Sequence, residues 1–576
     1  MKRTLLFASL LLCCGIVGCG QQTTSENKHA NQASPLARTQ SLPPSDEHPF
    51  ASDANAEVRT EQMHLPLASQ PASLGSQRQA TVVAAWPDSA EGHGPGMAGD
   101  RYASIVDNQF LQVINEPLST FSIDVDTASY ANTRRFLMQN SVLPPAGAVR
   151  VEELINYFTY DYKPPTSGEP FATHVEVAAC PWQPGHRLVR VALKGKVVDA
   201  EERPLSNLVF LLDVSGSMQS PDKIELMKHG MQRLVEELGE NDRVAIVVYA
   251  GASGLVMPST SADQKATIGQ KLQELQAGGS TNGGSGIQLA YQVARDNFIA
   301  GGINRVILAT DGDFNVGTTS QDQLVELVEK EADSGVFLSV LGFGRGNLND
   351  SMMEEISNRG NGNYAYLDTP REAEKVLVEQ VGGTLVTIAK DVKIQVEFNP
   401  AEVASYRLIG YENRKLENED FNDDKKDAGE IGAGHTVTAL YQVVPADAQT
   451  RPASTESNRT VDPLQFQGER PLTEAAKSGQ LLTLKIRYKQ PESEKSQLSV
   501  FPVNDEGDAF GQASQDFKFA TAAAAFGMLL RDSEHKGNLT FGAVAEIAKA
   551  NQGDDSEGYR AEFVKMVERA DALSGS

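Results

Sequence analysis

Four continuous apolar runs mark the middle of the chain. They cover residues 208–212, 244–248, 306–309 and 336–341, and segments with apolar positions at helical spacing lie between them. Strands that are buried on both faces have such continuous runs, and strands that alternate with amphipathic helices form parallel sheets covered by helices. The pattern therefore predicts a doubly wound, Rossmann-like α/β domain over residues 205–384.

A different pattern flanks this region. Residues 171–198 contain two period-two runs around a turn at 183–186, which is typical of a β-hairpin with one buried face. Alternating strands return over 385–510 and predict an antiparallel β-sandwich. Because two strands alone are marginally stable, we predict that the hairpin pairs with strands of 390–500. The α/β domain is then inserted in this sandwich or packed on it.

The two ends of the chain have their own patterns. Residues 1–18 combine a positively charged start with an apolar run too short to span a bilayer, which predicts a signal peptide. Residues 19–100 have no hydrophobic period and predict a disordered tether with a reach of roughly 50 Å. Residues 101–204 begin the ordered part as an N-terminal domain that includes the hairpin. Residues 511–576 form a helical segment, and their apolar spacing predicts helices at 517–531, 539–550 and 559–573.

Composition and charge narrow the class of protein. A chain of 576 residues is too long for one hydrophobic core, so we expect several domains. The formal net charge is −25, and the clustered Lys and Arg that nucleic-acid binding requires are missing, so nucleic acid is excluded as a partner.

Of the four cysteines, Cys13 and Cys14 lie in the signal peptide. Cys180 is the only cysteine after Cys19, which predicts a small buried residue, with a dimer-forming thiol as the alternative.

Oxygen-bearing side chains follow two of the apolar runs. Asp213, Ser215 and Ser217 form an Asp-x-Ser-x-Ser motif directly after the first run. Thr281 lies in a later glycine-rich loop, and Asp311 ends the third run. Since ligands bind at the carboxyl ends of parallel strands, we expect these residues to converge on surface loops there. Such hard oxygens suit a divalent metal, for which we expect Mg²⁺, with Mn²⁺ or Ca²⁺ as alternatives.

The order, spacing and strand context of these five residues resemble the metal-ion-dependent adhesion site of von Willebrand factor A (VWA) and integrin I domains. The resemblance implies that Ser215, Ser217 and Thr281 bind the metal directly. It implies that Asp213 and Asp311 bind it directly or through water. It further implies a protein ligand that supplies an acidic residue to the metal, and a function in protein–protein adhesion or binding.

Further segments resemble one bacterial branch, the YfbK-like VWA lipoproteins. Residues 119–130 and 151–158 resemble its N-terminal domain, and residues 526–533 resemble its C-terminal domain. The sequence Ile16-Val17-Gly18-Cys19 resembles a lipobox, which implies that Cys19 carries lipid and becomes the mature N-terminus. Gly20 resembles an outer-membrane sorting signal. We therefore expect a lipid-anchored protein of the bacterial cell envelope, in the outer membrane, on its periplasmic or its surface face.

Two other classes of function compete with adhesion. A structural or assembly factor of the envelope would hold its partner permanently, and would keep it when the metal is chelated. A hydrolase has little support, because neither a nucleophile elbow nor a P-loop is present. Asp124 and Asp126 resemble the first motif of haloacid-dehalogenase phosphatases, but Ala128 stands where that motif has Thr or Val. We expect these carboxylates to cap the following helix or to contact the α/β domain, and we expect no enzyme activity.

The acidic stretch 417–427 is the last candidate for chemistry. Its carboxylates suit Ca²⁺, but the stretch lacks the spacing of an EF-hand loop. We therefore interpret it as a solvated loop between two strands.

Overall fold

The computed structural model describes residues 99–575 except 167, 200, 281–282, 313–320, 347 and 447–470. The predicted signal peptide, nearly all of the predicted tether and the predicted lipidation residue Cys19 lie outside the described residues. So does Thr281. The described residues belong to one compact unit of the chain.

A six-stranded sheet forms the α/β domain, in the order β10-β9-β8-β5-β6-β7. All neighbours pair in parallel except the edge strand β7, which is antiparallel to β6. The predicted apolar runs are four of these strands, and β5 is buried at every position. The strands are β5 (Ser206–Asp213), β6 (Arg243–Tyr249), β7 (Ser253–Ser261), β8 (Ile303–Thr310), β9 (Phe337–Phe343) and β10 (Tyr364–Leu367).

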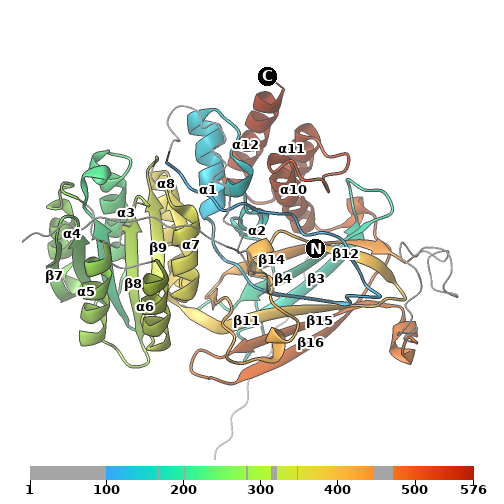
Figure 1. The fold of residues 1–576 in the computed structure, drawn as a ribbon, viewed down its shortest axis with the longest axis horizontal. Coiled ribbons are helices and arrows are strands. Elements are labelled where there is room, and N and C mark those ends of the chain that lie inside the picture. Colours follow the sequence, from blue (N-terminus) through green and yellow to red (C-terminus); the bar gives the residue numbers. More distant parts are fainter. Residues whose placement is uncertain are drawn as a thin grey trace, which may run out of the picture. The chain divides into compact units, whose positions relative to one another are not determined.

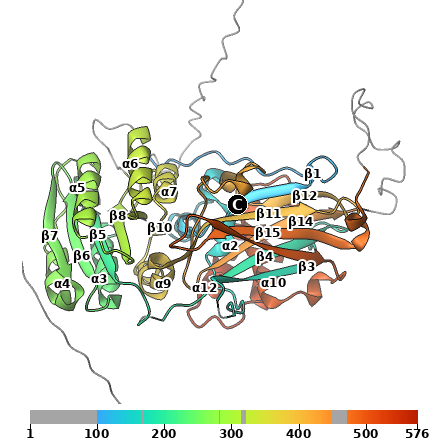
Figure 2. The ribbon, with the colours of Figure 1, turned by 90° about the horizontal axis from the view of Figure 1, so that it is seen from below.

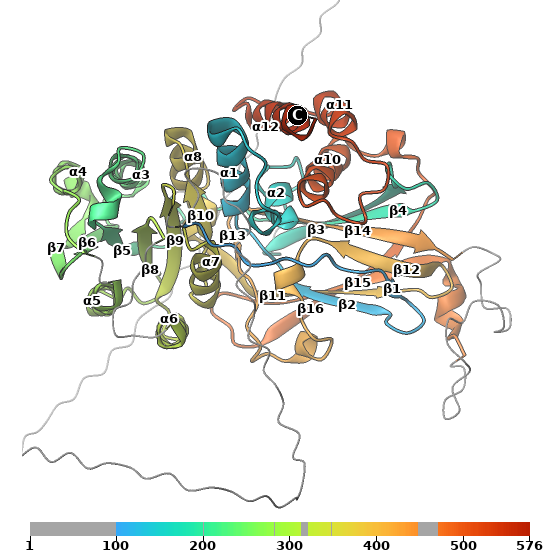
Figure 3. The ribbon, with the colours of Figure 1, turned by 45° about the horizontal axis from the view of Figure 1, so that its top comes forward.

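Helices cover both faces of this sheet, which confirms the doubly wound α/β fold. Helices α3 and α4 lie on one face and α5 and α6 on the other (Figures 2 and 3). Their apolar sides face the sheet, because residues such as Met227 and Ile287 are fully buried there. The helices are α3 (Ile224–Glu237), α4 (Lys265–Gln273), α5 (Gly283–Asp296), α6 (Gln321–Asp333), α7 (Asp350–Arg359) and α8 (Pro370–Glu374).

Two antiparallel sheets form a platform beside the α/β domain (Figure 1). One sheet has the order β1-β12-β14-β4-β3, and the other has the order β13-β11-β15-β16, with β2 paired to β11. Apolar residues of both sheets, among them Val191, Tyr441 and Leu484, share one buried core. The strands are β1 (Leu111–Gln112), β2 (Leu118–Ser122), β3 (Phe171–Ala179), β4 (Arg187–Gly195), β11 (Thr387–Phe398), β12 (Val403–Ile409), β13 (Ile431–Gly432), β14 (Thr436–Pro445), β15 (Gln480–Lys489) and β16 (Ser496–Asn504).

The predicted pairing of the hairpin with later strands is confirmed. Strand β4 of the hairpin pairs with β14 over eight residues, with Leu193 opposite Val437. Strands β1 and β2 also pair with later strands, β12 and β11. The chain leaves the platform after β4 and returns to it at β11. These two points lie together, since a Cβ on Gly195 would stand 2.9 Å from the side chain of Ile388. The α/β domain is therefore an insertion into the platform.

Helices cover the outer face of the β1-β12-β14-β4-β3 sheet. The three C-terminal helices lie there together with α2 (Figures 1 and 3). The Ala-rich face of α10 packs inward, because Ala520 and Ala523 are fully buried. Phe158 contacts Phe519 at 4.9 Å between ring centroids. Gly527 lets α10 approach α2, since a Cβ there would stand 2.9 Å from Val151. The helices are α1 (Ala128–Arg134), α2 (Val151–Asn156), α10 (Gln515–Leu530), α11 (Phe541–Ala550) and α12 (Tyr559–Ser574).

One smaller expectation is settled by the same packing. Cys180 is a free, buried thiol, and its burial raises its pKa to about 11. It therefore packs as the small buried residue that the sequence predicted.

Within the part of the chain that the structure describes, no helix combines the length and the apolar character that crossing a bilayer demands.

Candidate functional site

The carboxyl ends of β5 and β8 bring together two of the predicted site residues. These strands are parallel neighbours, with Leu212 opposite Ala309 in the register, so Asp213 and Asp311 stand at the same edge of the sheet. Their exposed fractions are 0% and 1%. The expectation of ligands on surface loops is therefore wrong for Asp213, which is buried and still part of β5. Asp311 follows β8 in a loop, as expected, but it is also buried.

The Asp-x-Ser-x-Ser turn is held in one arrangement by its own hydrogen bonds. The backbone N–H of Ser215 donates to Asp213 Oδ1 at 2.8 Å, and the hydroxyl oxygens of Ser215 and Ser217 lie 2.9 Å apart. Tyr249 Oη and Thr310 Oγ1 donate to Asp213 Oδ2 at 3.2 and 3.3 Å. The Asp213 carboxylate is thereby fixed from two neighbouring strands, with the two serine hydroxyls beside it.

The glycine-rich loop before Thr281 is hydrogen-bonded to this turn. The backbone N–H of Gly216 donates to Gly279 O at 3.0 Å, and that of Gly278 donates to Val214 O at 2.7 Å. A Cβ at Gly216 would stand 3.3 Å from Gly279 O, so the absence of a side chain at Gly216 allows the close approach of the two loops. Thr281 follows two residues later, outside the described residues.

Burial and charge set the electrostatics of the site. Burial raises the pKa of Asp213 to about 6, the hydrogen bonds from Ser215 oppose this shift, and the nearby Asp311 adds to it. Lys223 was missed by sequence reasoning, yet its Nζ donates to Asp311 Oδ2 at 2.8 Å. The only signal in the sequence is a lysine at the start of a helix, where a positive charge is unfavourable.

The donor set fits a hard divalent cation. Asp213, Ser215, Ser217 and Asp311 offer carboxylate and hydroxyl oxygens, which Mg²⁺ and Ca²⁺ prefer to nitrogen or sulfur. The two carboxylates also carry the charge that balances such an ion. The arrangement is therefore one that can bind a divalent cation and present it at the edge of the sheet.

Asp124 and Asp126 lie away from this site and join the α/β domain to the platform. Asp126 Oδ1 accepts a hydrogen bond of 2.7 Å from the backbone N–H of Tyr364 in β10. Arg414 pairs with Asp124 at 2.9 Å and with Asp126 at 3.2 Å. The prediction of a contact with the α/β domain is confirmed for Asp126. Neither caps α1, whose N-cap Thr127 also makes no capping hydrogen bond through its side chain.

Further buried ion pairs join the α/β domain to the N-terminal helices. Arg150, just before α2, pairs with Glu153 and with Asp350 of α7. Burial raises the pKa of Glu153 to about 8, although Arg150 opposes this shift. Arg134 of α1 pairs with Asp368, which follows β10. The α/β domain is thus joined to the N-terminal helices through ion pairs that are buried from solvent.

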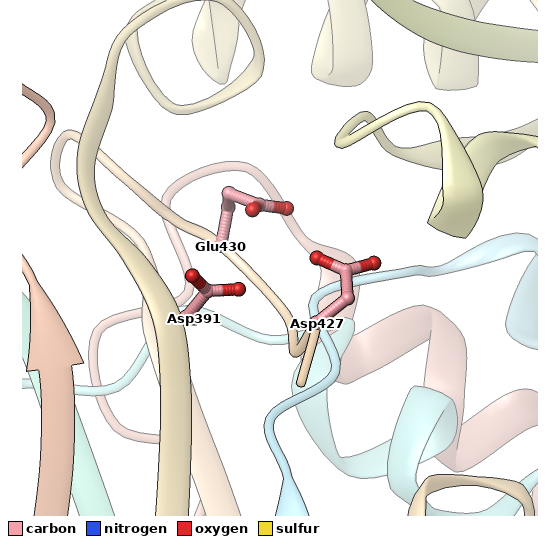
Figure 4. Close-up of side chains that lie close together, drawn as sticks. All are labelled: Asp391, Asp427 and Glu430. Carbon is pink, nitrogen blue, oxygen red and sulfur yellow. The ribbon is translucent and has the colours of Figure 1, made fainter. Parts of the chain in front are cut away.

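A third group of carboxylates lies where β11 meets the loop before β13. Asp391, Asp427 and Glu430 point toward one another, with one oxygen of each within 4.8 Å of the others (Figure 4). Lys489 Nζ lies 2.6 Å from Asp391 Oδ2. No second observation points to a ligand among these carboxylates, and we assign none to them.

The solvated-loop interpretation of residues 417–427 was only partly right. Asp427 is exposed, but Phe421 is buried, and Lys393 Nζ of β11 donates to the backbone oxygens of Asp420 and Asp423. The stretch is therefore bound to the platform through its backbone. Sequence spacing gave no sign of this, because the partner lysine lies in a different strand.

Comparison with known proteins shows which families the parts of the chain resemble. Three family models match: one described as von Willebrand factor type A domain over residues 207–379, one described as von Willebrand factor over 97–190, and one described as Uncharacterized protein YfbK, C-terminal, over 383–573. The Uncharacterized protein YfbK of Escherichia coli K12 is 45% identical over 487 residues, which are 83% of this chain and 82% of that protein.

More distant relatives share a smaller part of the chain. Human inter-alpha-trypsin inhibitor heavy chain H3 is 26% identical over 258 residues, which are 41% of this chain and 28% of that protein. Among solved structures, the von Willebrand factor type A protein from Catenulispora acidiphila has a TM-score of 0.40 and 15% identity, and the alignment covers 71% of this chain and 91% of that chain. The α/β domain coincides with the VWA match, and β11 to α12 coincide with the YfbK C-terminal match. The chain therefore belongs to the YfbK family of VWA-domain proteins.

Proposed function

We propose that this chain is a cell-envelope binding protein whose VWA domain holds a divalent cation and, through it, an acidic residue of a protein partner. One observation carries the proposal. The buried ends of β5 and β8 bring Asp213 and Asp311 to the same edge of the sheet, and Ser215 and Ser217 lie directly after Asp213. Mg²⁺ is our first choice, with Mn²⁺ and Ca²⁺ as alternatives, because all of these donors are oxygens.

The residues of the site have separate tasks in this proposal. Ser215 and Ser217 would hold the cation through their hydroxyls, together with Thr281 from the adjoining loop. Asp213 is kept in place by Tyr249 and Thr310, so it does not have to be ordered when the cation binds. A bound cation supplies the positive charge to which a carboxylate of the partner binds. The proposed activity is binding, without a chemical step.

Capture of partners from envelope extracts tests this proposal. The full chain, immobilised, should retain a partner in Mg²⁺ and release it in EDTA, because the partner's carboxylate has no cation to bind once the metal is removed. Asp311→Asn should fail to capture the same partner. Asp263→Asn, which removes an equal charge from an exposed position on the same domain, should capture it normally.

The same experiment distinguishes metal-dependent adhesion from the competing function, that of a structural or assembly factor. A partner that stays bound in EDTA, and that Asp311→Asn still captures, would contradict metal-dependent adhesion. That result would favour a structural or assembly factor that holds its partner permanently.

We also propose that lipid on Cys19 anchors the chain to the outer membrane. The support is the lipobox-like sequence that ends in Cys19 and the Gly20 that follows it. Cys19→Ser is expected to move the protein from the membrane fraction to the soluble fraction, because it removes the sulfur that carries the lipid. Immunoblots of both fractions after a carbonate wash measure this. If the Ser variant stays in the washed membranes, the chain has another anchor.

A further inference from the structure

Lys223 is a cation of the chain that lies at the proposed metal site. Its Nζ is 2.8 Å from Asp311 Oδ2, and the two side chains are 9% and 0% exposed. An ammonium group loses much of its hydration in such a place and is stable there only because it is paired with a carboxylate. This ion pair is therefore an integral part of the site and is shielded from solvent.

Two further features hold the Lys223 side chain in this position. Its backbone N–H donates to Ser220 O at 3.0 Å, and its carbonyl accepts from Met227 N at 2.8 Å, which fixes the residue at the start of α3. Its aliphatic stem lies against Gly344, just after β9. Gly344 has a φ of +69°, and a Cβ there would stand 2.1 Å from Lys223 Cε. The stem therefore follows a path that is open only because residue 344 has no side chain.

The ammonium group and a divalent cation would compete for one carboxylate. Asp213 and Asp311 together carry two negative charges, and Lys223 already offsets one of them. A divalent cation that draws on Asp311 would lie close to a like charge, and the repulsion is strong where water is excluded. The ammonium group would therefore have to move away from Asp311 as the metal binds.

We propose that Lys223 is a tethered cation that occupies the Asp311 carboxylate in the metal-free protein and thereby sets the metal affinity of the site. This inference rests on the proposed function, because it requires that a divalent cation binds at Asp213 and Asp311. It has two consequences. The metal-free domain stays stable, since the buried Asp311 carboxylate has a counter-ion. The affinity for metal is lower than the oxygen ligands alone would give.

The test is the affinity of the metal-stripped full chain for Mg²⁺, measured by calorimetric titration. Lys223→Met removes the charge and keeps most of the stem, so it should raise the affinity at least about ten-fold. Its melting temperature in EDTA should fall, because the buried Asp311 carboxylate loses the Lys223 ammonium group. Lys223→Gln is a second neutral variant whose amide still donates to Asp311, and its affinity should also rise. Lys223→Arg keeps the charge and should bind Mg²⁺ about as weakly as the natural chain.

A lysine substitution away from the proposed metal site is the control for these variants. Lys271→Met removes a lysine charge from α4, where it pairs with Glu274, and should leave the affinity unchanged. Equal or weaker Mg²⁺ binding by the two neutral variants, with clear binding by the natural chain, would overturn the role of Lys223 and leave the proposed function standing. Absence of Mg²⁺ binding from the natural chain and from both neutral variants would overturn the metal site itself.

Discussion

Asp213→Asn combined with Asp311→Asn is expected to abolish Mg²⁺ binding and to leave the fold intact. The two carboxylates supply the only negative charges among the predicted ligands, and a divalent cation cannot be held in a buried site without them. Asn has nearly the same shape as Asp, and its oxygen at position 213 can still accept from the Ser215 N–H. Calorimetric titration measures the affinity, and circular dichroism measures the fold.

The two single variants should differ in stability, which separates the roles of the carboxylates. Burial raises the pKa of Asp213 to about 6, so its charge is unfavourable in the metal-free site, and Asp213→Asn should cost little. Asp311→Asn leaves the Lys223 ammonium group without its carboxylate and should lower the melting temperature. Asp263→Asn is the control for both. Unchanged Mg²⁺ affinity in the double variant would contradict the adhesion-site assignment.

Division of the chain at the two junctions is expected to leave one stable fragment and two unstable ones. Residues 205–384 should fold alone, since they hold a complete six-stranded sheet with helices on both faces. Residues 100–204 and 385–576 should be unfolded apart and should associate when mixed. The reason is that β4 lies inside its sheet, between β14 and β3, so neither fragment can complete that sheet alone.

Circular dichroism and thermal unfolding of each fragment, and of the mixture, measure this. The fragment 205–384 should be less stable than the domain in the full chain, because Ala128 and Ala131 of α1 share its core. A useful control replaces 205–384 by a short Gly-Ser linker. That chain should fold as the platform, since Gly195 and Ile388 lie side by side at the junctions. If 385–576 alone is a stable monomer that unfolds cooperatively, the insertion is not needed for folding and the prediction is wrong.

The sequence by itself determined the elements whose signal is local. Continuous apolar runs identified the buried strands β5, β6, β8 and β9, because a strand covered on both faces has no polar positions to interrupt it. The C-terminal helices were predicted to within two residues at each end, since their apolar spacing is a property of the helix alone. The motif from Asp213 to Ser217 and the distant Asp311 were found because both follow such runs.

The tertiary structure decided everything that depends on which distant segments meet. The hairpin was expected to find partners beyond residue 385, but only the fold selected β14 as the neighbour of β4, because many alternating strands share the same pattern. The burial of Asp213 and the pairing of Lys223 with Asp311 were likewise hidden. Sequence spacing reports which side of an element is apolar, whereas the environment of a charge depends on every element packed around it. That environment exists only once the chain has folded.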